Sequence, residues 1–258
     1  MSTDTAAPHE WLRAYDWLTP APREHIGWDV DVLYGPWPRH HRDTGLAEVR
    51  TQLARSPVAG ALALSTRGAL FDDGAGNAET LRDLADCPEL LPVGTVDVRD
   101  ALTAERKLDE LDRAGVRFVR LFTVEQAADP GFPGYRHVVA LALARGMVLL
   151  HDGDPRRYGP PLMDRGADVV FLDLHAYLLA DFLLMARDEP GFRITTRMLS
   201  GPDSIERVVG SVGARHLVFG SRAPFMDVSP PALRLRYADI SDVDRAAIAT
   251  GNVEELLA

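Results

Sequence analysis

The chain has 258 residues, 46% of them hydrophobic, which is enough for one sizeable core in a single domain. Its formal net charge of -10 gives no basic excess that would attract phosphate groups, so a general role in binding nucleic acid or an anionic membrane is excluded. The single cysteine, Cys87, excludes a disulfide framework within the chain and a cysteine-rich zinc site.

Residues 1–27 form an N-terminal extension ahead of the first predicted strand. The stretch MSTDTAAPHEW includes acidic side chains and no apolar run, so we do not expect a secretion signal. The extension contains Trp11 and Trp17, and we expect it to pack on the folded domain or on a partner. No stretch of the chain approaches the roughly 20 apolar residues that span a bilayer. We therefore expect a cytoplasmic protein.

Eight short segments, most of them apolar, have the character of parallel strands that are covered on both faces. In chain order, the predicted strands are 28–34, 58–65, 90–98, 116–122, 146–152, 168–175, 192–199 and 216–221.

Helical patterns lie between these strands. In PDSIERVVGSV (202–212), for example, Ile205, Val208, Val209 and Val212 recur at the spacing of one helix face. Eight strands that alternate with helices predict an α/β fold, a single (β/α)8 TIM-type barrel over residues 28–258. The structural alternative is a doubly wound open sheet, but no glycine-rich nucleotide-binding motif follows the first strand.

Four segments, in a fixed order along the chain, carry a family resemblance. They are DVDVLYGPWP (29–38), LLPVGTVDV (90–98), AGVRFVRLF (114–122) and GARHLVFGSRAPF (213–225), and the closing IATGNVEELL (248–257) adds to them. The ordered set resembles the amidohydrolase-related family, the metal-dependent hydrolase and decarboxylase branch of the amidohydrolase superfamily. The resemblance implies an amidohydrolase-like barrel.

The resemblance also implies a divalent metal in the barrel mouth. The family's usual ligands are a His-x-His pair on strand 1, a histidine after each of strands 5 and 6, and an aspartate after strand 8. His151 and His175 match the two single histidines, whereas Asp31-Val32-Leu33 replaces the pair and Arg222 replaces the aspartate. Leucine cannot coordinate a metal, and a guanidinium group stays protonated and repels a cation. The resemblance therefore implies a degenerate metal site.

Two arrangements of these residues would still support chemistry. Asp31, His151 and His175 would make a two-imidazole, one-carboxylate site for a single metal ion, which Asp152 or Asp173 could join. Without a metal, His175 or His151 would act as a general base while the guanidinium group of the strand-8 arginine stabilises a developing oxyanion.

Four arginines stand near the predicted carboxyl ends of strands, the face where barrel enzymes bind their ligands. Arg67 follows strand 2, Arg99 follows strand 3, Arg197 lies near the end of strand 7, and Arg222 follows strand 8. Several guanidinium groups around one mouth would bind a carboxylate or phosphate, because each can hold an anion bidentately. The alternative is that each arginine pairs with an acidic residue close to it in sequence.

Three hypotheses for function follow, and they leave open whether the chain is an enzyme. The first is a non-hydrolytic pseudoenzyme without a cofactor, which binds a small anion or supports a partner. The second is an active hydrolase, decarboxylase or lyase with one divalent metal (zinc, iron or manganese) on Asp31, His151 and His175. The third is a metal-free acid–base enzyme. The expected partners are a small anionic ligand and either a second copy of this chain or a paralogous amidohydrolase subunit.

Overall fold

Eight parallel strands, in the order of the chain, form the sheet of this protein. The computed structural model describes residues 25–37, 44–70 and 72–258, and most of the predicted N-terminal extension lies outside these ranges. The strands are β1 (Ile26–Tyr34), β2 (Val58–Ser65), β3 (Leu90–Thr95), β4 (Phe118–Leu121), β5 (Val148–His151), β6 (Val169–Phe171), β7 (Phe192–Thr195) and β8 (Leu217–Val218). All eight predicted strands are present, and β1 begins two residues earlier than predicted.

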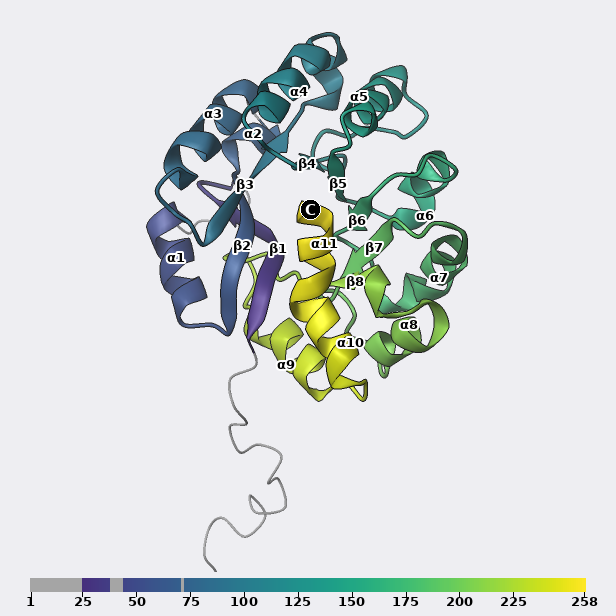
Figure 1. The fold of residues 1–258 in the computed structure, drawn as a ribbon. Helices are drawn as coiled ribbons and strands as arrows, with labels where there is room; N and C mark the ends of the chain where they lie inside the picture. The colour runs from purple at the N-terminus through teal and green to yellow at the C-terminus, as the bar shows by residue number, and fades with distance from the viewer. Residues whose placement is uncertain (1–24, 38–43, 71) are drawn as a thin grey trace, which may run out of the picture.

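The sheet closes between its first strand and the segment that follows β8. The Val30 amide donates to the Phe219 carbonyl at 3.0 Å, and the Leu33 amide donates to the Ala223 carbonyl at 2.9 Å. Helices surround the strands (Figure 1). The predicted (β/α)8 barrel is therefore confirmed, and the open-sheet alternative is wrong.

Helices connect the strands and continue beyond the last one. They are α1 (Leu46–Ala54), α2 (Arg67–Leu70), α3 (Asp73–Leu84), α4 (Ala104–Arg113), α5 (Pro133–Ala144), α6 (Pro155–Tyr158), α7 (Leu179–Asp188), α8 (Ser204–Val212), α9 (Ser229–Tyr237), α10 (Asp242–Ala246) and α11 (Asn252–Leu257). A π-helical segment, Ala247–Gly251, joins α10 to α11. Within the described residues, no helix is both long enough and apolar enough to cross a membrane.

The apolar core has two parts, because alternate residues of each strand face opposite sides. Val119 and Leu149 face outward and pack under the helices, whereas Phe118 and Leu150 face the barrel interior. Val253 of α11 belongs to the interior cluster, and α11 lies across one end of the barrel in Figure 1. That end is closed by apolar side chains, so polar groups inside the barrel gather at the other end.

Candidate functional site

Three aspartates and three arginines meet at the carboxyl ends of the strands. They come from β1 and β4 and from the segments that directly follow β5, β6, β7 and β8. The six residues, which we call the mouth cluster, are Asp31, Arg120, Asp152, Asp173, Arg197 and Arg222. Their formal charges cancel, which is the condition under which buried charges are tolerated.

Asp31 lies at the centre of the mouth cluster and is fully buried. A β-bulge in β1, between Asp29 and Val32, lies at this position. The Arg120 Nη1 donates to Asp31 Oδ1 at 2.7 Å, and the Arg222 Nε donates to Oδ2 at 3.1 Å. Burial alone would raise the pKa of Asp31, but the surrounding guanidinium groups outweigh it and hold that pKa far below its ordinary value.

Arg120 is a fully buried arginine in the middle of β4, and the sequence analysis did not predict its role. It shares the inward face with Phe118 and Phe122, and its guanidinium carbon lies 4.7 Å from the centre of the Phe122 ring. Its Nη2 donates to Asp152 Oδ1 at 2.9 Å. The sequence VRFVRLF (116–122) could have indicated this role. Arg120 alternates with Phe118 and Phe122 on one face of the strand, and a charged residue on a buried face needs a buried partner.

Asp173 forms the solvent-facing side of the mouth cluster. Its Oδ1 accepts a hydrogen bond from Arg222 Nη2 at 3.0 Å and another from Arg197 Nη2. The Asp173 side chain is 26% exposed and that of Arg222 is 18% exposed, whereas Arg120 and Asp31 are completely covered. Two guanidinium groups therefore converge on one carboxylate at the edge that solvent reaches.

Asp152 lies on the inner side of the same arginine. The Arg222 Nη2 is 3.4 Å from Asp152 Oδ1, an oxygen that also accepts from Arg120. Burial raises the pKa of Asp152 to about 7, although both guanidinium groups oppose that rise. Asp152 is thus the carboxyl group of the cluster that exchanges a proton near neutral pH.

The backbone that presents Arg222 is tightly constrained. Arg222 has a φ of +67°, a left-handed conformation that costs a residue with a side chain about 1 kcal/mol. Just before it, Gly220 comes so close to β7 that an added Cβ would lie 2.8 Å from Thr195 Cγ2. The Ser221 amide donates to Asp29 Oδ1 at 3.0 Å, and the Ser221 hydroxyl donates to Asp29 Oδ2. Asp29 therefore fixes the turn that places Arg222 in the mouth.

Removing the Ser221 hydroxyl should destabilise the protein measurably. Asp29 is fully buried, and burial raises its pKa to about 6, so its carboxyl group depends on these hydrogen bonds. We expect Ser221→Ala to lower the free energy of unfolding by about 1–3 kcal/mol, as measured by urea denaturation. Ser211→Ala, at an exposed position in α8, is the matched control and should change it by less than about 0.5 kcal/mol. Equal effects of the two substitutions would contradict this role of Asp29.

His151 does not reach the mouth cluster. It follows Leu150 in β5 and faces outward, where its ring lies 4.6 Å from that of Tyr158. Its Nε2 is 2.9 Å from the Tyr135 hydroxyl, and its Nδ1 is 2.6 Å from the Asp152 carbonyl oxygen. Burial lowers the pKa of His151 to about 4. Both ring nitrogens are thus engaged away from the barrel interior.

His175 lies at the start of the turn that leads into α7. It is partly buried, and its ring stacks on the exposed ring of Tyr177 at 4.9 Å between centroids. The described residues include no group of three or more His, Cys, Asp or Glu side chains arranged to hold a metal ion. The structure therefore does not bring Asp31, His151 and His175 together as the metal-site hypothesis requires.

The four predicted anion-binding arginines separate into two pairs. Arg197 and Arg222 belong to the mouth cluster. Arg67 and Arg99 are about half exposed and pair with acids outside the mouth cluster: Arg67 Nη1 lies 3.6 Å from Glu79, and Arg99 binds both carboxylate oxygens of Asp97. Local pairing, the alternative that the sequence left open, thus describes Arg99, whereas the partner of Arg67 lies further along the chain, in α3.

The donor set of the mouth cluster does not fit a divalent metal ion in this arrangement. Each of its carboxylates already accepts hydrogen bonds from arginine, and Arg222 contacts all three of them. A divalent ion about 4 Å from a guanidinium group would be repelled by roughly 8 kcal/mol at an effective dielectric constant of 20. The arginines thus balance the negative charge that a metal would otherwise neutralise.

Aromatic side chains border the arginines. The Trp37 ring centroid lies 6.3 Å from that of Phe122, which packs against Arg120, and 5.8 Å from that of Phe225. Trp37 and Phe225 are partly buried, so their rings contribute apolar surface close to the charged groups.

No known protein-family model matches this sequence, and it has no match among curated proteins. Solved structures do share the fold. The 2,6-dihydroxybenzoate decarboxylase from Rhizobium is 12% identical, with a TM-score of 0.71 over 90% of this chain and 99% of that one. The 5-carboxyvanillate decarboxylase from Sphingomonas paucimobilis is 13% identical, with a TM-score of 0.72 over 91% and 99%. A dihydroxybenzoic acid decarboxylase from Polaromonas sp. JS666, with bound manganese and the inhibitor 2-nitroresorcinol, is 11% identical, with a TM-score of 0.68 over 90% and 97%.

Identities this low establish the fold alone, and they confirm the barrel that the resemblance to amidohydrolases implied. All three proteins are decarboxylases, and one of them is described with a metal ion.

Proposed function

We propose that this chain binds a small organic carboxylate, most favourably an aromatic one, at the mouth cluster and decarboxylates it. The site would use arginine side chains and no metal ion, although one decarboxylase of this fold is described with bound manganese. The observation that carries the proposal is the convergence of Arg197 and Arg222 on the Asp173 carboxylate. That arrangement shows where two guanidinium groups bind one carboxylate in this barrel.

The Asp173 carboxylate would be displaced by the carboxylate of a ligand. Among the carboxylates of the mouth cluster, Asp173 is the most exposed, while Asp31 and Asp152 are buried and keep the arginines oriented. A ligand carboxylate in its place would receive the same two guanidinium groups. The rings of Trp37 and Phe225 would offer apolar surface to the rest of an aromatic ligand.

Decarboxylation requires a group that holds the carboxylate and a group that donates a proton, and the cluster contains both. The bond between the carboxyl carbon and its neighbour breaks, carbon dioxide leaves, and the neighbouring carbon keeps the electron pair and takes up a proton. Arg222 and Arg197 would hold the carboxylate, and Asp152, beside Arg222, would donate the proton. The fold likeness to decarboxylases of dihydroxybenzoate and carboxyvanillate supports this reaction class.

Replacing Arg222 by methionine tests the carboxylate site directly. The loss of a charged, partly buried donor should weaken the binding of benzoate by at least about 30-fold, as measured by calorimetry. Arg222→Lys should weaken it less, because the charge remains while the planar fork is lost. Arg67→Met is the control, since Arg67 pairs with Glu79 outside the cluster and should leave benzoate affinity unchanged.

Asp173→Asn provides the opposite test. Removing its charge frees two guanidinium groups, so the affinity for benzoate should rise by at least about tenfold. If Asp173→Asn leaves the affinity unchanged and Arg222→Met behaves like Arg67→Met, carboxylates do not bind at the cluster. The proposal then fails whatever reaction the protein catalyses.

The reaction itself is tested by carbon dioxide release from a series of hydroxybenzoates. We expect release to survive chelation and to be lost in Asp152→Asn. Release that requires added manganese would favour the metal-dependent alternative, for which manganese-bound decarboxylases of this fold are the precedent. Benzoate binding without release from any of these carboxylates would favour the non-catalytic hypothesis.

A further inference from the structure

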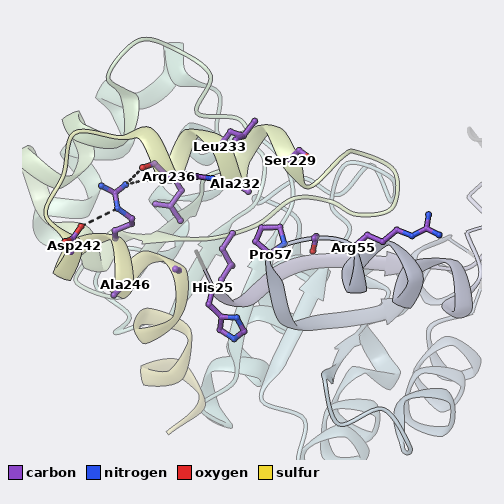
Figure 2. Close-up of a pocket in the computed structure, with 14 residues that line it drawn as sticks. His25, Arg55, Pro57, Ser229, Ala232, Leu233, Arg236, Asp242 and Ala246 are labelled. Atoms are coloured by element: carbon purple, nitrogen blue, oxygen red, sulfur yellow. Dashed lines mark hydrogen bonds and ion pairs between the residues drawn. The ribbon is translucent and has the colours of Figure 1, made fainter. Parts of the chain in front are cut away.

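A groove lies on the opposite face of the barrel from the mouth cluster. It has a volume of about 550 Å³ and is bordered by the starts of β1 and β2 and by α9 and α10 (Figure 2). Ile26, which lines it, is the first residue of β1, and Pro57 directly precedes β2. Parallel strands all begin at the same end of a barrel, so this groove belongs to the face away from the carboxyl ends.

The groove combines apolar surface with basic side chains. Ile26, Pro57 and Leu233 contribute apolar atoms, and Leu233 in α9 is 49% exposed, so the groove offers apolar surface that a further segment could cover. Arg55, Arg236 and Arg245 line the same groove, and Asp242, an acid that also lines it, pairs with Arg245 at 4.0 Å. The Nη2 of Arg236 is buried and has no hydrogen-bond partner in the part of the chain that the structure describes. The groove therefore suits an apolar segment that carries acidic groups.

The chain itself contains such a segment directly before the groove. Residues 10–18, EWLRAYDWL, include five large apolar side chains, and two acids against one arginine give them a formal charge of -1. His25 lines the groove and is separated from this segment by only six residues. Six residues span at most about 20 Å, so the segment is held close to the groove.

We propose that residues 10–18 of the same chain occupy this groove and cover α9. Tethering favours this occupant over a separate molecule, because a short linker gives an effective concentration of about a millimolar. The apolar side chains would cover Leu233, and the acids would approach Arg55 and Arg236. The predicted N-terminal extension would thus pack against the barrel, as the sequence led us to expect, on the face opposite the mouth cluster.

Hydrogen exchange of the full-length protein tests this proposal. Amides of residues 10–18 should exchange at least about tenfold more slowly in the wild-type protein than in Leu233→Glu, which places a charge in the groove. Leu184→Glu, at a 59% exposed leucine on α7, is the matched control and should leave these amides protected. If Leu233→Glu does not fold, a Trp11→Ser/Leu12→Ser chain should instead show faster exchange at residues 229–236.

Two results would overturn the proposal. One is free exchange of residues 10–18 in the wild-type protein. The other is protection that falls when the protein is diluted, since it would mean that the segment occupies the groove of a second copy. Protection that is independent of protein concentration and is lost only in the groove variant is the supporting result.

Discussion

Replacing Arg120 by leucine is expected to lower the free energy of unfolding by about 3–5 kcal/mol, the cost of removing one partner from a buried network of ion pairs. Arg120 is fully buried and donates to Asp31 and Asp152, neither of which has solvent to replace it. Urea denaturation, with Arg120→Leu compared with the wild-type protein at neutral pH, measures the loss. Arg106→Leu removes an exposed ion pair with Glu110 in α4 and should cost no more than about 0.5 kcal/mol.

A double substitution separates charge balance from packing. Arg120→Leu together with Asp152→Leu removes one charge of each sign, so Arg197 and Arg222 remain balanced by Asp31 and Asp173. The double variant should therefore recover part of the stability that Arg120→Leu loses, because the effects of substitutions within one network on the free energy of unfolding are not additive. If the stability that the double variant loses relative to the wild-type protein equals the sum of the two single losses, the cluster is not a coupled unit.

The fold was predictable because barrel strands are short and apolar on both faces, so each one appears in the sequence as a separate run. The strand ends were less predictable. Segment 168–175 was predicted as one strand, but β6 ends at Phe171. The Leu172 amide still donates to the His151 carbonyl of β5, and Leu174 beyond it is also buried, so the apolar pattern continues past the strand pairing. Burial, which the sequence reveals, and strand pairing, which it does not, thus end at different residues.

Site residues could be predicted where their position at a strand end was enough. They could not be predicted where the side chain's direction, inward or outward, depended on a shift of one residue along the strand. Asp31, Arg197 and Arg222 lie at the carboxyl ends of strands, and the barrel brings them together as such placement implies. His151 matched the family pattern but faces outward, and its neighbour Asp152 takes the inward position. At the end of β5, a shift of one residue therefore decides which side chain faces the mouth cluster and which packs outside the barrel.

Asp152→Asn should change how stability depends on pH. Because burial raises the pKa of Asp152 from 3.8 to about 7, the folded protein holds a proton there that the unfolded chain releases. Stability from this group is complete below pH 4 and falls as the pH rises to 7, by about 4 kcal/mol in all. Asparagine cannot titrate, so the stability of the variant relative to wild type should rise by that amount between pH 4 and 7. Urea denaturation across this range measures the difference.

Comparing the two proteins at each pH isolates Asp152 from the other buried groups. Asp29, with a pKa raised to about 6, and His151, with a pKa lowered to about 4, titrate in both and cancel in the difference. Asp154→Asn is the control, since Asp154 is partly exposed and its pKa is lowered, so its curve should run parallel to wild type above pH 5. A parallel curve for Asp152→Asn would mean that Arg120 and Arg222 keep this carboxylate ionised throughout. It would then lack the proton that decarboxylation requires, and the proton donor would have to be another group.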